Sequence, residues 1–298
     1  MNSRNSLLTK WSKYVIYLSL VFLLLALYKA DYFILPKVHS PLLLAVSFVF
    51  LFIGFLLSSI CWGKMLNKHN YLIGTKDYIA SSGISILTQY IPGKFWLIAS
   101  RAAYLAEKKS LPLGKLSAIS LNVQLIFLLL GLIFGALGLF MLNAFFIWGW
   151  LAVVLCIGLS VVIFTNLSQT ILEKIVRKVF RKNLRIQKTY VKSIFTVLPW
   201  FFLNWILWSI GYYFFVISIS TVAVPLVVGL GYPLACVSGI MAFFMPAGLG
   251  AFEGSIIGYL QLAGFSSNTA ISISIASRLW DLIGTILFFL VGVIADRK

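Results

Sequence analysis

Long runs of apolar residues, separated by short polar loops, set the pattern of this chain. A helix rises about 1.5 Å per residue, so crossing a hydrocarbon core about 30 Å thick takes about 20 apolar residues. Six runs have this length, and they cover residues 14–35, 42–62, 116–142, 144–165, 194–217 and 269–295. The pattern therefore predicts six transmembrane helices.

Two further apolar segments are interrupted by helix-breaking residues. Residues 79–105 lie between the second and third runs, and residues 242–261 lie between the fifth and sixth. The breaks are Pro92, Gly93, Pro246, Gly248 and Gly250. Irregular backbone at membrane depth is tolerated only where protein buries it or where it lines a wet cavity. We therefore expect two re-entrant helical hairpins that face the interior of an all-α membrane bundle.

Composition places the chain among integral membrane proteins. Of its 298 residues, 61% are hydrophobic and only 10% are charged, a balance foreign to soluble domains of this size. The formal net charge of +17 comes mainly from bases between the apolar runs, which indicates cytoplasmic loops rather than nucleic-acid binding. The expected location is the cell membrane, with the N- and C-termini in the cytoplasm.

The segment at residues 168–192 is the most basic part of the chain. Leu172, Ile175 and Val179 fall at helical spacing within it, with lysines and arginines between them. This pattern predicts an amphipathic helix on the inner leaflet, bound to anionic lipid. A plain solvated basic loop is the alternative.

The order of elements repeats in the two halves of the chain. Residues 13–142 and residues 144–295 each contain a span, a span, a hairpin and a span. Three crossings per half is an odd number, so the second half is inverted relative to the first. We expect a single polytopic domain over residues 1–298 that is built as an inverted repeat.

Local matches accompany this repeated order. Pro246 follows Pro92 by 154 residues, and Thr-Ala-Ile-Ser at 269–272 follows Ser-Ala-Ile-Ser at 117–120 by 152. Inverted repeats with interrupted segments in corresponding places are typical of transporters that hold their substrate near the bilayer midplane.

Five charged residues fall within or near the expected bilayer. They are Lys94, Arg101, Glu253, Arg278 and Asp281. Charges at this depth are costly and usually mark a functional path. The planar guanidinium groups of Arg101 and Arg278 are suited to bond two oxygens of a phosphate, and Lys94 adds a positive charge. We predict that these three residues bind a lipid phosphate. Glu253 and Asp281 are expected to form ion pairs with these cations or to couple the movement.

Each of these charges also has a purely structural interpretation. Lys94 is placed to snorkel from a hairpin tip, and Arg101 is placed to touch lipid headgroups without specificity. Arg278 and Asp281 are three residues apart on one helix, so they are able to neutralise each other. Glu253 is able to pair with Arg278 as a structural ion pair.

No catalytic or cofactor motif stands out in the sequence. His39 and His69 lie apart from cysteines and carboxylates, and Cys61, Cys156 and Cys236 are isolated. The chain has no phosphate-binding loop, nucleophile elbow or metal-ligand spacing. We therefore expect no enzyme activity, no metal and no cofactor.

Three segments carry a resemblance to a known family. They are Y-I-P-G-K-F-W-L-I-A-S-R at 90–101, P-A-G-L-G-A-F-E-G at 246–254 and S-R-L-W-D at 277–281. Together they resemble the membrane region of the lysylphosphatidylglycerol synthetase/flippase family, over nearly the whole chain. The resemblance implies a lipid-flippase domain with paired re-entrant helices.

The chain also departs from that family's pattern. The soluble aminoacyl-transferase domain is missing from this sequence, so we expect a stand-alone member without lysine transfer to lipid. Phe95-Trp96 replaces a frequent Gly-Glu pair, which favours another phospholipid or a lipid-linked sugar as the substrate.

The expected function is translocation of a phospholipid or a polyprenyl- or lipid-linked saccharide across the cell membrane, in cell-envelope polysaccharide or lipid modification. A non-transporting scaffold that binds a glycosyltransferase is the first alternative. A membrane prenyl-diphosphate phosphatase is the second. That chemistry needs clustered carboxylates and a Ser-Arg-Ser-type phosphate loop, which this sequence does not contain.

Overall fold

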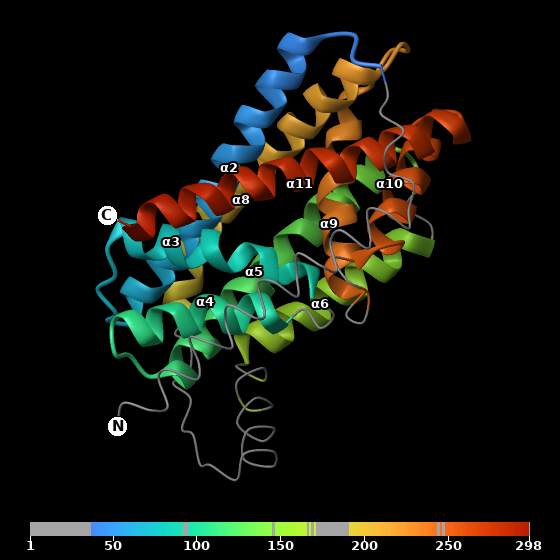
Figure 1. The fold of residues 1–298 in the computed structure, drawn as a ribbon. Coiled ribbons are helices and arrows are strands. Elements are labelled where there is room, and N and C mark those ends of the chain that lie inside the picture. The colour runs from blue at the N-terminus through green and yellow to red at the C-terminus, as the bar shows by residue number, and fades with distance from the viewer. Residues whose placement is uncertain are drawn as a thin grey trace.

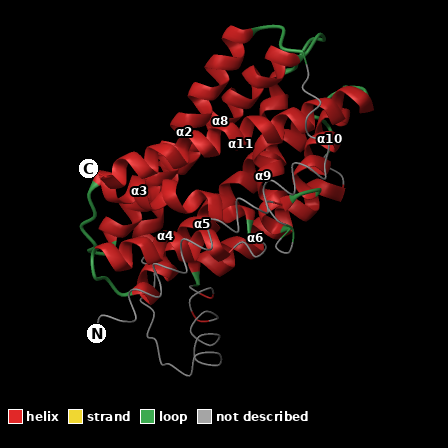
Figure 2. Ribbon diagram, viewed as in Figure 1, coloured by secondary structure: helices red, strands yellow, loops and turns green. Residues whose placement is uncertain are grey.

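In the computed structural model, the regular secondary structure of the described part of the chain is helical, and short loops and turns join the helices (Figures 1 and 2). The described residues are 37–91, 95–144, 147–165, 167, 170, 191–242, 245 and 248–297. Outside them lie the first predicted span, most of the basic segment at 168–192, and Pro92, Gly93, Lys94 and Pro246. No strand occurs within the described ranges.

Four described helices are long and apolar enough to cross a bilayer. They are α2 (Pro41–Lys68), α5 (Leu113–Met141), α8 (Val191–Ile219) and α11 (Ser267–Arg297). Each covers one of the predicted runs to within one residue, so four of the six predicted spans are confirmed by length and composition. The fourth predicted span corresponds to α6 (Ile147–Phe164), which is apolar but shorter than these four.

Two pairs of short helices lie between the long ones. The first hairpin consists of α3 (Thr75–Ser85), the 3-10 helix η1 (Ile86–Tyr90) and α4 (Phe95–Lys108). The second hairpin consists of the 3-10 helix η2 (Leu226–Leu230), α9 (Gly231–Met241) and α10 (Ala251–Leu262). In each hairpin the two α-helices pack against each other. The second hairpin begins at Leu226, earlier than the interrupted segment at 242–261 suggests.

Charged side chains fix the base of the first hairpin. Lys109 and Lys108 bond Asp77 at the start of α3, at 2.7 and 3.3 Å. Lys108 also bonds Asp296, in the last turn of α11, at 2.8 Å. The base of this hairpin therefore lies beside the C-terminal end of α11, as Figure 1 shows.

Neutral contacts fix the base of the second hairpin at the other end of α11. The Tyr259 hydroxyl donates to the Val227 carbonyl oxygen at 2.8 Å, which ties the two arms together. The Gln261 amide donates to Ser267, the first residue of α11, at 2.9 Å. The two hairpins therefore enter the bundle from opposite ends.

Packing between the hairpins and the long helices follows a crossed pattern. The first α-helix of each hairpin packs on a long helix of the other half, α3 on α11 and α9 on α5. The second α-helix packs on the next long helix of its own half, α4 on α5 and α10 on α11. Helices α2 and α8 pack along each other.

Two serines make similar hydrogen bonds in the two halves of the chain. Ser120 on α5 donates to the Ile98 carbonyl oxygen of α4 at 2.9 Å, and Ser274 on α11 donates to the Glu253 carbonyl oxygen of α10 at 3.2 Å. These serines are 154 residues apart, as are the two prolines that interrupt the sequence.

Buried aromatic rings fill the centre of the bundle. Tyr212 and Tyr232 stack with ring centroids 5.3 Å apart. Trp208 and Trp280 each meet Tyr232 edge to face, at 5.8 and 5.3 Å. These rings join α8, α9 and α11, and they form a rigid wall beside the candidate site.

Candidate functional site

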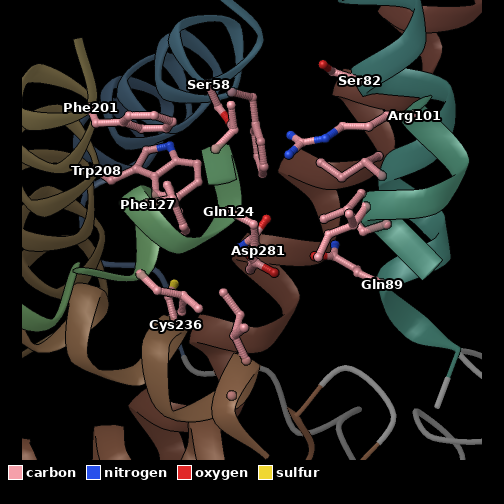
Figure 3. A pocket seen from close by; sticks show the side chains of 18 of the residues that line it. Ser58, Ser82, Gln89, Arg101, Gln124, Phe127, Phe201, Trp208, Cys236 and Asp281 are labelled. Carbon is pink, nitrogen blue, oxygen red and sulfur yellow. The ribbon is translucent and has the colours of Figure 1, made fainter. Parts of the chain in front are cut away.

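A cavity of about 380 Å³ lies where the two hairpins meet the long helices (Figure 3). We call it the central cavity. It is lined mostly by apolar and aromatic side chains, with a few polar groups, as ligand sites usually are. The polar side chains in its lining are Ser58, Ser82, Gln89, Arg101, Gln124, Tyr232, Arg278 and Asp281.

Arg101 is a buried cation held by neutral groups. It lies on α4 and is 6% exposed. Its Nε donates to Ser120 Oγ and its Nη2 to the Ser120 carbonyl oxygen, both at 2.6 Å. The guanidinium carbon lies 4.8 Å from the centre of the Trp62 ring. No carboxylate among the described residues forms an ion pair with Arg101, and its guanidinium points into the central cavity (Figure 3).

Arg278 has a carboxylate partner in the second hairpin. Its Nε donates to Glu253 Oε1 at 2.7 Å, and the two side chains are 7% and 12% exposed. The guanidinium also lies 4.3 Å from the centre of the Phe252 ring. This pair joins α11 to α10, and Arg278 reaches the lining of the central cavity.

The local sequence before α10 places Glu253 for this role. Gly248 and Gly250 have φ angles of +70° and +82°, which side chains other than glycine rarely adopt. Gly250 ends the turn, and its N–H donates to Glu253 Oε2 at 2.7 Å. A carboxylate in the first turn of a helix is favourable there. Glu253 thus caps α10 with one oxygen and binds Arg278 with the other.

Asp281 lies one turn after Arg278 and also lines the central cavity. Its Oδ1 accepts a hydrogen bond from the Tyr232 hydroxyl of α9 at 2.6 Å. The side chain is therefore anchored to the second hairpin through a buried tyrosine.

The structure brings Arg101, Arg278 and Asp281 to one cavity, with Glu253 reached through Arg278. Gly248 and Gly250 lie at the turn of the second hairpin, as expected. Lys94 is outside the described residues, together with Pro92, Gly93 and Pro246.

Several lining groups were not among the predicted site residues. The amides of Gln89 and Gln124 and the hydroxyl of Ser58 share the cavity with Arg101. Gln124 lies in the middle of an apolar span, and a polar residue at that depth is a signal that the sequence does contain. Ser120, which holds Arg101, resembles the small residues common in membrane helices and gives no such signal.

Fold and site together define a multi-pass helical membrane protein with two hairpins around a central cavity. Within the described ranges, no cluster of residues suited to a metal ion occurs. The family model described as lysylphosphatidylglycerol synthase TM region matches residues 11–292. The chain belongs to this family, which confirms the resemblance seen in the three sequence segments. Comparison with curated proteins and with solved structures finds no similar chain.

Proposed function

We propose that the protein is a flippase-like translocase that moves a phosphate-bearing lipid across the cell membrane. The observation that supports this most is Arg101, a buried guanidinium that faces the central cavity without a carboxylate partner in the described residues. A charge in low dielectric is costly until it is paired. A lipid phosphate would supply the missing negative charge, while its acyl or prenyl tails stay in the bilayer.

The arrangement of the hairpins supports movement of the bound headgroup. They enter from opposite ends and meet at one cavity, so rocking of one half against the other would open the cavity to each face in turn. We propose that residues 13–142 and 144–295 are the two inverted repeats, with two re-entrant hairpins and both termini in the cytoplasm. The proposed role is transport without covalent chemistry.

Reconstitution into proteoliposomes tests the proposal. A trace of fluorescent phospholipid is added, and a membrane-impermeant quencher reports lipid that crosses to the outer leaflet. Arg101→Met should slow the crossing by about tenfold or more, because a hydrogen bond to a charged group contributes about 1.5–3 kcal/mol. Arg297→Met, at the exposed end of α11, is the matched control and should leave the rate unchanged.

Equal rates in Arg101→Met and the unmodified protein would overturn the proposed path. A folded protein that moves no lipid at all would favour the scaffold function, with a glycosyltransferase as its partner.

Cys236 offers a second readout, because it lines the central cavity (Figure 3). In a Cys156→Ser background, an impermeant maleimide is applied to one face of sealed vesicles at a time. Alternating access predicts slow labelling of Cys236 from either face. Labelling from one face only, under all lipid conditions, would contradict it.

A further inference from the structure

Neutral hydrogen-bonding groups share the central cavity with Arg101. Gln124 comes from α5, Gln89 from η1 and Ser58 from α2. Gln124 makes no hydrogen bond with the part of the chain that the structure describes. Gln89 donates through Nε2 to Thr285 Oγ1 at a long 3.4 Å. Figure 3 shows both amides beside the cavity that the Arg101 guanidinium enters.

These amides have a definite chemical preference. An amide left without hydrogen bonds in an apolar setting costs about 2–7 kcal/mol, so the ligand or water must meet it. Each amide both donates and accepts. A hydroxyl group also does both, whereas an ammonium group only donates and selects carboxylates. Asp281, the carboxylate in the lining, accepts from Tyr232 through one oxygen, so the neutral groups of Gln89, Gln124 and Ser58 carry the preference for hydroxyls.

The aromatic side of the cavity suits the same kind of ligand. Trp208 uses its ring N–H for the Leu51 carbonyl oxygen, at 2.9 Å, and is held edge to face against Tyr232. Its hydrogen-bonding capacity is therefore spent, and what it offers the cavity is apolar ring surface. Phe127 and Phe201 extend this surface. The C–H faces of a polyol pack on such a wall, while its hydroxyls reach the amides opposite.

We propose that the central cavity selects a lipid phosphate that bears a polyhydroxylated headgroup, such as glycerol, inositol or a sugar. Arg101 binds the phosphate, and Gln124 and Gln89 bind the hydroxyls. This inference rests on the proposed lipid translocation and adds the headgroup class.

Matched lipids test the headgroup without changing the charge. Phosphatidylmethanol, phosphatidylglycerol and phosphatidylinositol with the same acyl chains carry the same negative charge and differ in their hydroxyls. Binding to the purified full chain is measured by native mass spectrometry. We expect the glycerol and inositol lipids to bind about tenfold more tightly than the methanol lipid, which corresponds to one or two net hydrogen bonds.

Two variants separate the headgroup from the phosphate. Gln124→Leu should remove the preference and leave binding of phosphatidylmethanol unchanged, and its apolar side chain should not harm folding. Gln261→Leu is the control: it loses the hydrogen bond to Ser267 at the base of the second hairpin, outside the cavity lining, and should keep the preference. Arg101→Met should weaken all three lipids alike.

A further pair identifies the source of the hydroxyls. Binding of polyprenyl phosphate is compared with binding of the same carrier bearing a hexose, and the hexose form is then compared with phosphatidylinositol. Tighter binding of the hexose form than of phosphatidylinositol assigns a lipid-linked sugar, and the reverse order assigns a phospholipid.

Equal binding of the three matched phospholipids, or a preference that survives in Gln124→Leu, would overturn the headgroup inference and leave lipid translocation standing. Binding of none of the lipids would overturn both.

Discussion

The two hairpins provide for their buried arginines in opposite ways. Arg101 on the first hairpin contacts the neutral groups of Ser120 and the Trp62 ring. Arg278, which packs against the second hairpin, bonds the Glu253 carboxylate at 2.7 Å. In the second hairpin the protein supplies the negative charge, and in the first no described carboxylate does so.

This difference affects how a phosphate would meet each arginine. A phosphate that approaches Arg101 gains an ion pair and displaces no carboxylate of the described residues. A phosphate that approaches Arg278 competes with Glu253, which also caps α10. The sequence treats both arginines as equivalent phosphate ligands. We propose Arg101 as the primary ligand, because Glu253 already pairs with Arg278.

Removing Glu253 should have the largest effect on stability. In Glu253→Ala the buried Arg278 loses this carboxylate partner, and such a loss costs about 3–5 kcal/mol. Gly250 N–H also loses its acceptor. We expect a large fall in melting temperature in detergent, measured by size-exclusion chromatography after heating.

Glu107→Ala removes an exposed carboxylate from α4 and serves as the control, with an unchanged melting temperature. The double variant Glu253→Ala/Arg278→Met should recover much of the loss. If Glu253→Ala melts like Glu107→Ala, the ion pair does not support the second hairpin.

Removing Arg101 should have the opposite effect: stability is kept and lipid binding is lost. Arg101→Met takes away a buried cation that has no carboxylate partner among the described residues, so the melting temperature should stay the same or rise. Phosphate-lipid binding should fall about tenfold or more. Both are measured on the same preparation. A loss of stability as large as that of Glu253→Ala would remove the contrast between the hairpins.

In the turn of the second hairpin, substitution of Gly248 should lower the melting temperature the most. A Cβ on Gly248 would lie 2.3 Å from the Gly239 carbonyl oxygen, in addition to the positive φ, whereas a Cβ on Gly250 meets only the strain of its own φ. Left-handed backbone costs about 1–2 kcal/mol for other residues. We expect Gly248→Ala to lower the melting temperature more than Gly250→Ala.

Gly254→Ala is the matched control for these two variants. It lies inside α10 with open space around it, and alanine favours a helix. Its melting temperature should stay level or rise. If all three variants lower the melting temperature equally, the close approach of Gly248 to Gly239 does not determine the stability of this turn.

The smallest effect is expected at the base of the first hairpin. Burial alone would raise the pKa of Asp77, but hydrogen bonds from Lys109 and Lys108 lower the pKa below its ordinary value. A lowered carboxylate pKa adds stability above the ordinary pKa, and this stability is lost as the pH falls through the pKa of the folded state. Asp77→Asn should therefore cost about 1 kcal/mol or less at neutral pH, and nothing in acid.

Melting curves of Asp77→Asn and the unmodified protein over a pH series provide the measurement. The two proteins should converge toward acid pH. A difference in melting temperature that persists in acid would mean that Asp77 acts through its shape rather than its charge.

Apolar length made the long helices predictable. A run of about 20 apolar residues has few alternatives to a membrane helix, and α2, α5, α8 and α11 follow those runs. The start of the second hairpin was harder, because residues 226–241 are apolar and uncharged. Hydropathy does not distinguish an arm that turns back after Met241 from part of a span.

The charged residues of the candidate site were predictable from the sequence, whereas the residues that contact them through helix packing were not. Glu253 and Arg278 stood out as charges in apolar segments. The groups that hold Arg101 did not, because a serine and a tryptophan are ordinary residues in a membrane helix. Ser120 and Trp62 meet Arg101 only because α4 packs against α5 and reaches α2, and no local pattern contains that information.

Helix α11 contacts both hairpins. Toward its C-terminal end, Gly292 and Gly83 of α3 bring their backbones so close that a Cβ on either would lie 2.7 Å from the other's Cα. Nearer its start, Arg278 bonds Glu253 of the second hairpin. A stiff helix joined to both hairpins makes their displacements interdependent. Under the proposed translocation, this linkage would couple the opening of one hairpin to the position of the other, and so would limit the leak of protons and ions through the cavity.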